Sequence, residues 1–328
     1  MDRWVGVLRV ALDPSGVPRF RVAASLCFSP SSGTLAPPSA NAVFFTGDRA
    51  EGTGNPVIEE LSDSANIARL LVSKLGAAVN AWVVEAAAFT GPFAVYREFV
   101  PSVDSWGNPR RYDPEGFPAS TSVVALLSKC VRQVRDMIAN RQREPAATNM
   151  YLSRSVSSYI PRTVLFGFSK GGIILNQILA EIAGLRPKAA DPFLGIGNSS
   201  VGTIKVEDQN FPTSENSFLH SISEFHYVDV GLNCAGAYLT DHVMIKEIVD
   251  YLYHRGDNVQ FLFHGSPRQW CDKHRPWIFK EKERLVKLLE EEACKTDGKV
   301  GVKERFYFQN MPPSLQMHFE IIKDIDLS

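Results

Sequence analysis

The chain of 328 residues is 45% hydrophobic and 22% charged, which is ordinary for a globular protein that buries a core without disulfides or metals. Its formal net charge of −1 gives no electrostatic reason to expect binding to nucleic acid or to an anionic membrane. No run of about 18 apolar residues occurs, so we expect no transmembrane segment.

The N-terminal third predicts the edge of a sheet followed by buried strands. Residues 4–28 alternate apolar and polar positions, as antiparallel strands near a sheet edge do. Continuous apolar runs at 42–45 and 82–84 are typical of strands buried on both faces, with a helix over 63–75 between them. Residues 89–120 are rich in Gly, Pro and aromatic side chains and are expected to form a long loop.

Strands and helices alternate through the rest of the chain. Helices are expected in amphipathic segments, which are 123–138, 173–185, 241–254, 276–294 and 314–324. Strands are expected in short apolar runs, which are 163–168, 224–229, 259–264 and 305–308. This alternation predicts an α/β protein whose mostly parallel central sheet has helices on both faces. We expect one domain over 1–328, with loop or cap excursions near 89–120 and 186–220.

A nucleophile-elbow pattern joins one of these strands to the next helix. Gly167-Phe168-Ser169-Lys170-Gly171 is G-x-S-x-G between an apolar run and a helix, which is the setting of the nucleophile in α/β-hydrolases. The tight turn would expose the Ser169 hydroxyl, and the two glycines would let strand and helix approach closely. The pattern predicts a serine hydrolase with an α/β-hydrolase-like fold.

A serine nucleophile needs a base, and the base needs an orienting acid; in this fold the acid precedes the histidine along the chain. His318 lies after the final predicted strand, where the base belongs. Two aspartates qualify as the acid: Asp229 ends the strand after the elbow unit, and Asp272 lies in the loop after the next strand. Both stay open. His226 and His264 lie in strands and are expected to be core or supporting groups.

The oxyanion of acyl transfer needs two N–H donors. We expect the backbone N–H of Lys170, with a second donor from Gly47 or Asp48 in the loop after an early strand. That loop lacks the His-Gly pattern of typical lipases, and the Asp48 charge would oppose an oxyanion unless Arg49 or the fold directs it away. Neither a zinc-type spacing of His and Cys nor a phosphate loop occurs, so we expect no metal and no cofactor.

Several segments together resemble the eukaryotic family of the human chromosome 2 open reading frame 69 protein. They are Phe45-Thr46-Gly47-Asp48, the elbow with Leu175-Asn176-Gln177, Tyr227-Val228-Asp229, Pro267-Arg268-Gln269 through Asp272 with Arg275, Trp277 and Glu281, and Gln316-Met317-His318-Phe319. The resemblance covers the chain from about residue 40 onward, and the chain looks like a plant version. It implies an α/β-hydrolase-like fold with a Ser-Asp-His triad and no settled substrate.

The family's vertebrate member is mitochondrial, whereas the N-terminus of this chain suggests another compartment. Its first residues carry an early Asp2 and show neither a secretory core nor an evident transit signal. Five scattered cysteines without a C-x-x-C pair favour a reducing compartment over a disulfide framework. We therefore expect an intracellular protein, cytoplasmic rather than mitochondrial.

Together these features predict an esterase, lipase or thioesterase acting on a small-molecule or lipid-like acyl substrate. Four aromatic residues are candidates to line an apolar pocket: Phe89, Phe93, Trp106 and Phe117. Two alternatives stay open, namely a hydrolase-fold binding or regulatory protein with little or no catalysis, and an acyltransferase. Nothing in the sequence indicates nucleic-acid binding or identifies a protein partner.

Overall fold

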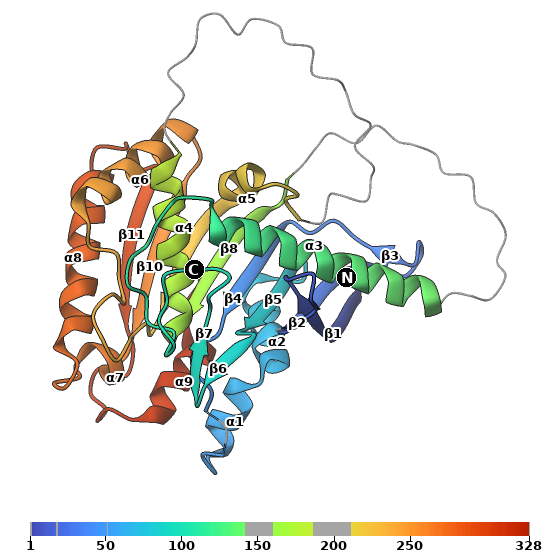
Figure 1. Cartoon of the computed structure of the whole chain (residues 1–328), viewed down its shortest axis with the longest axis horizontal. Coiled ribbons are helices and arrows are strands. Elements are labelled where there is room, and N and C mark those ends of the chain that lie inside the picture. Colours follow the sequence, from blue (N-terminus) through green and yellow to red (C-terminus); the bar gives the residue numbers. More distant parts are fainter. Residues whose placement is uncertain (1, 18, 51, 142–159, 186–210, 328) are drawn as a thin grey trace, which may run out of the picture.

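A mostly parallel sheet forms the centre of the molecule, in a computed structural model that describes residues 2–17, 19–50, 52–141, 160–185 and 211–327 (Figure 1). The strand order is β1 (Asp2–Ala11), β2 (Arg19–Ser29), β5 (Val79–Glu85), β4 (Ala40–Phe45), β8 (Arg162–Phe168), β9 (Ile222–Val228), β10 (Val259–Gly265) and β11 (Val300–Phe306). The pairs β1–β2 and β2–β5 are antiparallel, and every neighbouring pair from β5 to β11 is parallel. The short β3 (Thr34–Leu35) pairs with β2, and β6 (Ala88–Thr90) forms a separate hairpin with β7 (Phe93–Val95).

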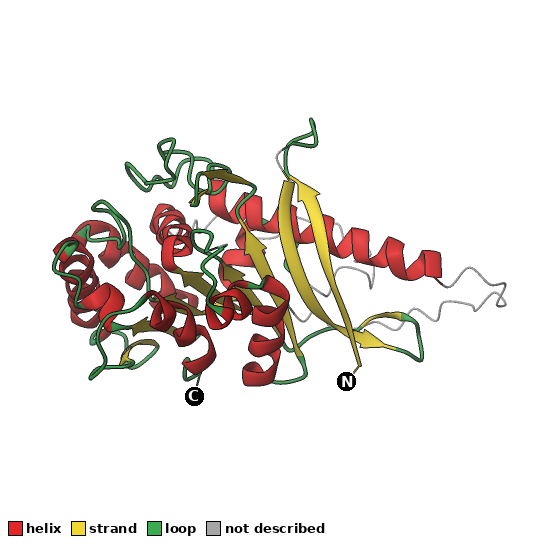
Figure 2. Ribbon diagram, turned by 90° about the horizontal axis from the view of Figure 1, so that it is seen from below, coloured by secondary structure: helices red, strands yellow, loops and turns green. Residues whose placement is uncertain are grey.

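Helices cover both faces of this sheet and create two cores (Figures 1 and 2). One face carries α1 (Pro56–Ser62), α2 (Ser64–Leu75) and α9 (Leu315–Asp324). The other carries α3 (Pro118–Arg141), α4 (Gly172–Gly184), α5 (Glu215–Ser221), α6 (His242–Arg255) and α8 (Pro276–Ala293), and the short α7 (Pro267–Trp270) follows β10.

The central strand β4 shows why its sequence is apolar throughout. Successive side chains of a strand point to opposite faces. Ala42 and Phe44 therefore belong to the core under α1, α2 and α9, whereas Val43 and Phe45 belong to the core under α3 and α4. All four are buried, as expected for a strand covered on both sides.

The expected α/β-hydrolase-like class is confirmed, as is the antiparallel edge formed by the N-terminal strands. The last strand was predicted at 305–308 but occupies Val300–Phe306. β11 has β10 as its one neighbour in the described sheet, so Lys303, Glu304 and Arg305 are exposed to solvent. Because these three residues are charged, the strand does not form the continuous apolar run by which the other strands were predicted.

The two expected excursions have different outcomes. The region 89–120 is not all loop, because it includes the β6–β7 hairpin and the first turn of α3. Of the region 186–220, residues 186–210 lie outside the described residues, and α5 begins at Glu215. Within the described ranges, every helix is too short or too polar to cross a bilayer.

Candidate active site

Ser169 occupies a sharp turn between β8 and α4. Its φ angle is +52°, a left-handed conformation that costs a non-glycine residue about 1–3 kcal/mol and persists where the surroundings enforce it. A Cβ at Gly171 would collide with the backbone carbonyl of Phe45, and one at Gly167 would approach Gly172 Cα to 2.7 Å. The strand–turn–helix geometry expected of G-x-S-x-G is therefore present, with Ser169 8% exposed at its apex.

The loop that follows β4 lies directly against Ser169. A Cβ built on Gly47 would lie 2.5 Å from Ser169 Cβ and 3.0 Å from Ser169 Oγ. No side chain fits in that space, so the backbone of this loop can approach the serine. The segment 46–48 thus borders the Ser169 side chain.

Asp229 is the aspartate that the structure brings to His318. It follows β9 with a φ of +45° and is fully buried. Its Oδ2 lies 2.6 Å from His318 Nδ1 and accepts a hydrogen bond from Ser266 Oγ at 2.8 Å, while its Oδ1 accepts from Ser266 N at 2.7 Å. Three donors thus fix both carboxylate oxygens.

His318 lies on α9, which Ser314 caps by accepting a hydrogen bond from Met317 N at 3.2 Å. The imidazole is 6% exposed, and its ring centroid lies 4.6 Å from that of Phe168, the residue before Ser169. Because Nδ1–H faces a carboxylate, Nε2 is left with the lone pair that a base uses. Among the described hydrogen bonds, none joins Ser169 Oγ to His318; in unliganded hydrolases this contact is often long.

Asp272, the other candidate acid, forms its hydrogen bonds with neighbouring residues and not with His318. Its Oδ2 accepts from Arg275 Nε at 2.8 Å and its Oδ1 accepts from His274 N at 2.8 Å. Partial burial raises the pKa of Asp272, but these hydrogen bonds outweigh it and leave the pKa below its usual value. The structure therefore brings one of the two candidate acids to His318 and not the other.

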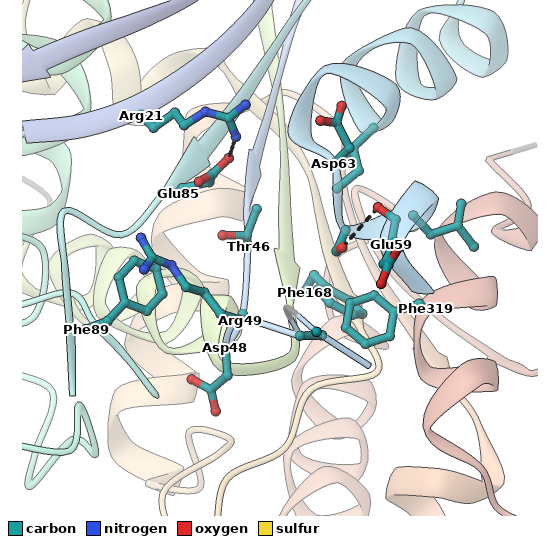
Figure 3. Close-up of a pocket in the computed structure, with 16 residues that line it drawn as sticks. Arg21, Thr46, Asp48, Arg49, Glu59, Asp63, Glu85, Phe89, Phe168 and Phe319 are labelled. Carbon is teal, nitrogen blue, oxygen red and sulfur yellow. Dashed lines mark hydrogen bonds and ion pairs between the residues drawn. The ribbon is translucent and has the colours of Figure 1, made fainter. Parts of the chain in front are cut away.

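The Asp48 carboxylate is paired, although not by the residue that the sequence suggested. Its Oδ1 accepts from Ala94 N at 2.8 Å and lies 3.2 Å from Lys170 Nζ. Arg49 instead lies over the ring of Phe89, 3.7 Å from its centroid. Figure 3 shows that the side chains of Asp48 and Arg49 point in different directions. Sequence reasoning missed the Lys170 ammonium beside Asp48 and the Ser266 donors to Asp229.

A cavity of about 360 Å³ lies beside Phe168 and Phe319, the chain neighbours of Ser169 and His318, which themselves do not line it (Figure 3). The glycines Gly47 and Gly52 also border it. Its other lining side chains are apolar, hydroxyl-bearing or charged: Ala50, Leu61, Ile67, Phe89, Thr46, Ser62, Arg21, Asp48, Arg49, Glu59, Asp63 and Glu85. Among the four aromatic candidates Phe89 lines the cavity, whereas Phe93 and Trp106 pack edge to face at 5.6 Å.

Two buried histidines lie behind the acid. His264 O accepts a hydrogen bond from Asp229 N at 2.7 Å, and His264 Nε2 lies 3.1 Å from His226 Nδ1. Burial lowers the pKa of His226 and lowers that of His264 well below its usual value, so both rings are neutral at neutral pH. In the part of the chain that the structure describes, no group of three His, Cys, Asp or Glu side chains is arranged to hold a metal ion.

Comparison with known proteins identifies relatives. A sequence profile of the C2orf69 family matches residues 127–295, just over half of the chain. The mitochondrial protein C2orf69 homolog of Danio rerio is 24% identical over 251 residues, which are 74% of this chain and 59% of that protein. The Homo sapiens protein is 23% identical over 206 residues, 60% of this chain and 44% of its own length. The chain thus spans about half the length of the relatives it matches.

Solved structures that resemble the chain include two bacterial enzymes. The IroE-like serine hydrolase of Shewanella oneidensis gives a TM-score of 0.43 at 12% identity, covering 98% of this chain and 78% of that one. The S-formylglutathione hydrolase of Agrobacterium tumefaciens gives 0.40 at 12% identity, covering 98% and 92%.

The relatives correct one expectation. The N-terminus suggested a cytoplasmic rather than a mitochondrial protein, and that is wrong, because the relatives from Danio rerio, Mus musculus and Homo sapiens are all named mitochondrial proteins. The early Asp2 and the strand-like pattern of residues 4–28 describe β1 and β2 of the fold and carry no information on the organelle.

Proposed function

The chain belongs to the C2orf69 family, and we propose that it is a serine hydrolase that cleaves ester or thioester bonds of an acyl substrate. The observation that supports this most is the 2.6 Å contact between the buried Asp229 carboxylate and His318 Nδ1. A carboxylate in this position fixes the imidazole tautomer whose Nε2 accepts a proton. Ser169 directly follows Phe168, whose ring contacts the His318 imidazole.

In this proposal Ser169 Oγ attacks the acyl carbonyl while His318 Nε2 removes its proton. The same nitrogen then protonates the leaving group, and a water repeats the sequence to release the acid. Asp229 orients His318 and stabilises the imidazolium that forms. The N–H of Lys170 and an N–H of the Gly47–Asp48 segment stabilise the oxyanion.

The cavity of about 360 Å³ supports a small-molecule or lipid-like acyl group as the occupant. Its wall combines the aromatic rings of Phe89, Phe168 and Phe319 with charged side chains from the loop after β4, from β2 and β5, and from α1 and its C-cap. Such a mixture suits an apolar acyl chain joined to a polar group. Following its named relatives, we place this activity in mitochondria.

A hydrolase-fold binding module is the second candidate. Its motivating observations are the acidic residue Asp48 beside Gly47 and the lack of a Ser169–His318 hydrogen bond among the described residues. In that case the cavity would hold an acyl ligand without turning it over.

A fluorophosphonate probe separates the two candidates, because it reacts with activated serines and spares ordinary ones. We expect labelling of the folded chain that disappears in Ser169→Ala, whereas Ser73→Ala, which removes an exposed hydroxyl on α2, labels like the parent. Labelling that survives Ser169→Ala contradicts the proposed nucleophile. A folded parent protein that takes no label favours the binding module.

A further inference from the structure

Lys170 is a buried lysine beside the candidate nucleophile. Its side chain is 4% exposed, and Nζ donates a hydrogen bond to the backbone oxygen of Trp106 at 2.8 Å. Nζ also lies 3.2 Å from Asp48 Oδ1 and 4.8 Å from the centroid of the Phe93 ring. A charge taken out of water in this way needs such compensation, since burying an unpaired ammonium is strongly unfavourable.

These contacts join the elbow to three other segments of the chain. Asp48 follows Gly47, whose backbone lies against Ser169, and the Asp48 carboxylate accepts a hydrogen bond from Ala94 N in β7. Trp106 belongs to the loop beyond the β6–β7 hairpin. The Lys170 side chain therefore connects the segment 46–48, the hairpin and the loop at Trp106 to the turn that carries the serine.

The charges at this position are unusual for acyl transfer. A carboxylate follows the glycine whose backbone borders the serine, and it would raise the energy of an oxyanion formed there. An ammonium paired with that carboxylate makes the pair close to neutral, so that the backbone donors act without opposition. Arg49 does not serve this purpose, because it lies over Phe89.

We propose that Lys170 is a positioning residue whose ammonium cancels the Asp48 charge beside the oxyanion. The inference rests on the proposed hydrolase function and adds to it a role for a side chain, whereas that function used only the backbone of Lys170. It also explains how a loop without the His-Gly pattern can serve as an oxyanion loop.

Removing the two charges singly and together distinguishes this role from simple loop anchoring. The turnover of a p-nitrophenyl ester is measured for the parent, Lys170→Met, Asp48→Asn and the double variant, with melting temperatures recorded for each. Lys170→Met should lower kcat by about 10- to 100-fold with little change in KM, because an uncompensated carboxylate opposes the transition state. The double variant should regain activity to within about threefold of Asp48→Asn.

Asp48→Asn alone leaves the ammonium in place and removes the opposing charge. Its kcat should fall less than that of Lys170→Met. If Lys170→Met fails to fold, the comparison of the double variant with Asp48→Asn still tests the inference, because an anchoring role for Lys170 predicts a further loss in the double variant and charge cancellation predicts none beyond about threefold. Lys282→Met is the matched control, since Lys282 is equally buried, pairs with Glu304 and lies 4.3 Å from the Trp270 ring centroid, outside the candidate site. That control should lower the melting temperature and leave kcat unchanged.

The outcomes separate the two hypotheses. If the parent shows no turnover that depends on Ser169, the hydrolase proposal fails and the role of Lys170 fails with it. If the parent turns over substrate but the double variant is as slow as Lys170→Met, or is more than about threefold slower than Asp48→Asn, the hydrolase proposal stands and the role of Lys170 is refuted.

Discussion

Replacing Asp229 by asparagine removes the carboxylate charge while keeping the shape of the side chain. In the parent, Oδ2 meets both His318 Nδ1 and Ser266 Oγ, and Oδ1 meets Ser266 N. All three partners donate to the carboxylate, so an amide cannot satisfy them all, because one of its two terminal atoms is itself a donor.

The size of the effect follows from which donor is left unmatched. If the amide oxygen takes the place of Oδ1, its NH₂ group faces His318 Nδ1 and the imidazole must move its proton to Nε2, where it can no longer accept the serine proton. If the amide is reversed, NH₂ faces Ser266 N–H, which costs about 1–3 kcal/mol for a buried unmatched donor. We expect kcat to fall by about 10⁴-fold, ~5.5 kcal/mol in the barrier, as the loss of an orienting carboxylate does in serine proteases.

The assay is the second-order rate of fluorophosphonate labelling together with p-nitrophenyl ester turnover, with urea unfolding recorded in parallel. Asp272→Asn is the control, because Asp272 bonds to Arg275 and the backbone of His274 instead of His318. It should leave both rates within about threefold of the parent. Equal losses in the two variants, or no loss in Asp229→Asn, would refute the assignment of the acid.

Two further predictions concern the loop and the buried histidines. Gly47→Ala places a Cβ 2.5 Å from Ser169 Cβ, so it should cost about 1–3 kcal/mol in urea unfolding and slow phosphonate labelling by at least about tenfold; parent-like labelling would show that the loop lies elsewhere. Because the pKa values of His226 and His264 are lowered in the folded chain, these two side chains bind protons below about pH 6.5 in the unfolded chain but not in the folded chain. Stability should therefore fall as the pH drops below about 6.5, with a slope of at most about 1.4 kcal/mol per pH unit for each histidine, and a slope that is unchanged in His226→Asn/His264→Asn would contradict this.

Local features of the site could be predicted from the sequence because short-range rules decide them. The turn at Ser169 needs small residues at fixed positions, and the spacing of Gly167 and Gly171 predicts it. The alternation of apolar runs and amphipathic segments likewise predicts the parallel sheet and its flanking helices. Strand β11 is less visible, since an edge strand exposes polar side chains that mask its period.

Choices that depend on tertiary contacts could not be made from the sequence. Asp229 and Asp272 both follow strands, and only the course of the chain after β9 and β10 decides which carboxylate reaches α9. A weak local signal existed, because Arg275 stands three residues after Asp272 and pairs with it. Nothing near Lys170 in the sequence indicates that its ammonium donates a hydrogen bond to the backbone oxygen of Trp106.

If Ser169 is the nucleophile, it becomes acylated during turnover, and the mass of the intact protein reveals this directly. A slowly hydrolysed p-nitrophenyl ester is mixed with the parent protein, the reaction is quenched in acid, and the acylated peptide is mapped. We expect a burst of p-nitrophenol matched by one acyl group on Ser169, and no acyl group in Ser169→Ala. An acyl group on another residue, or a folded protein that never gains one, would rule out Ser169 as the nucleophile.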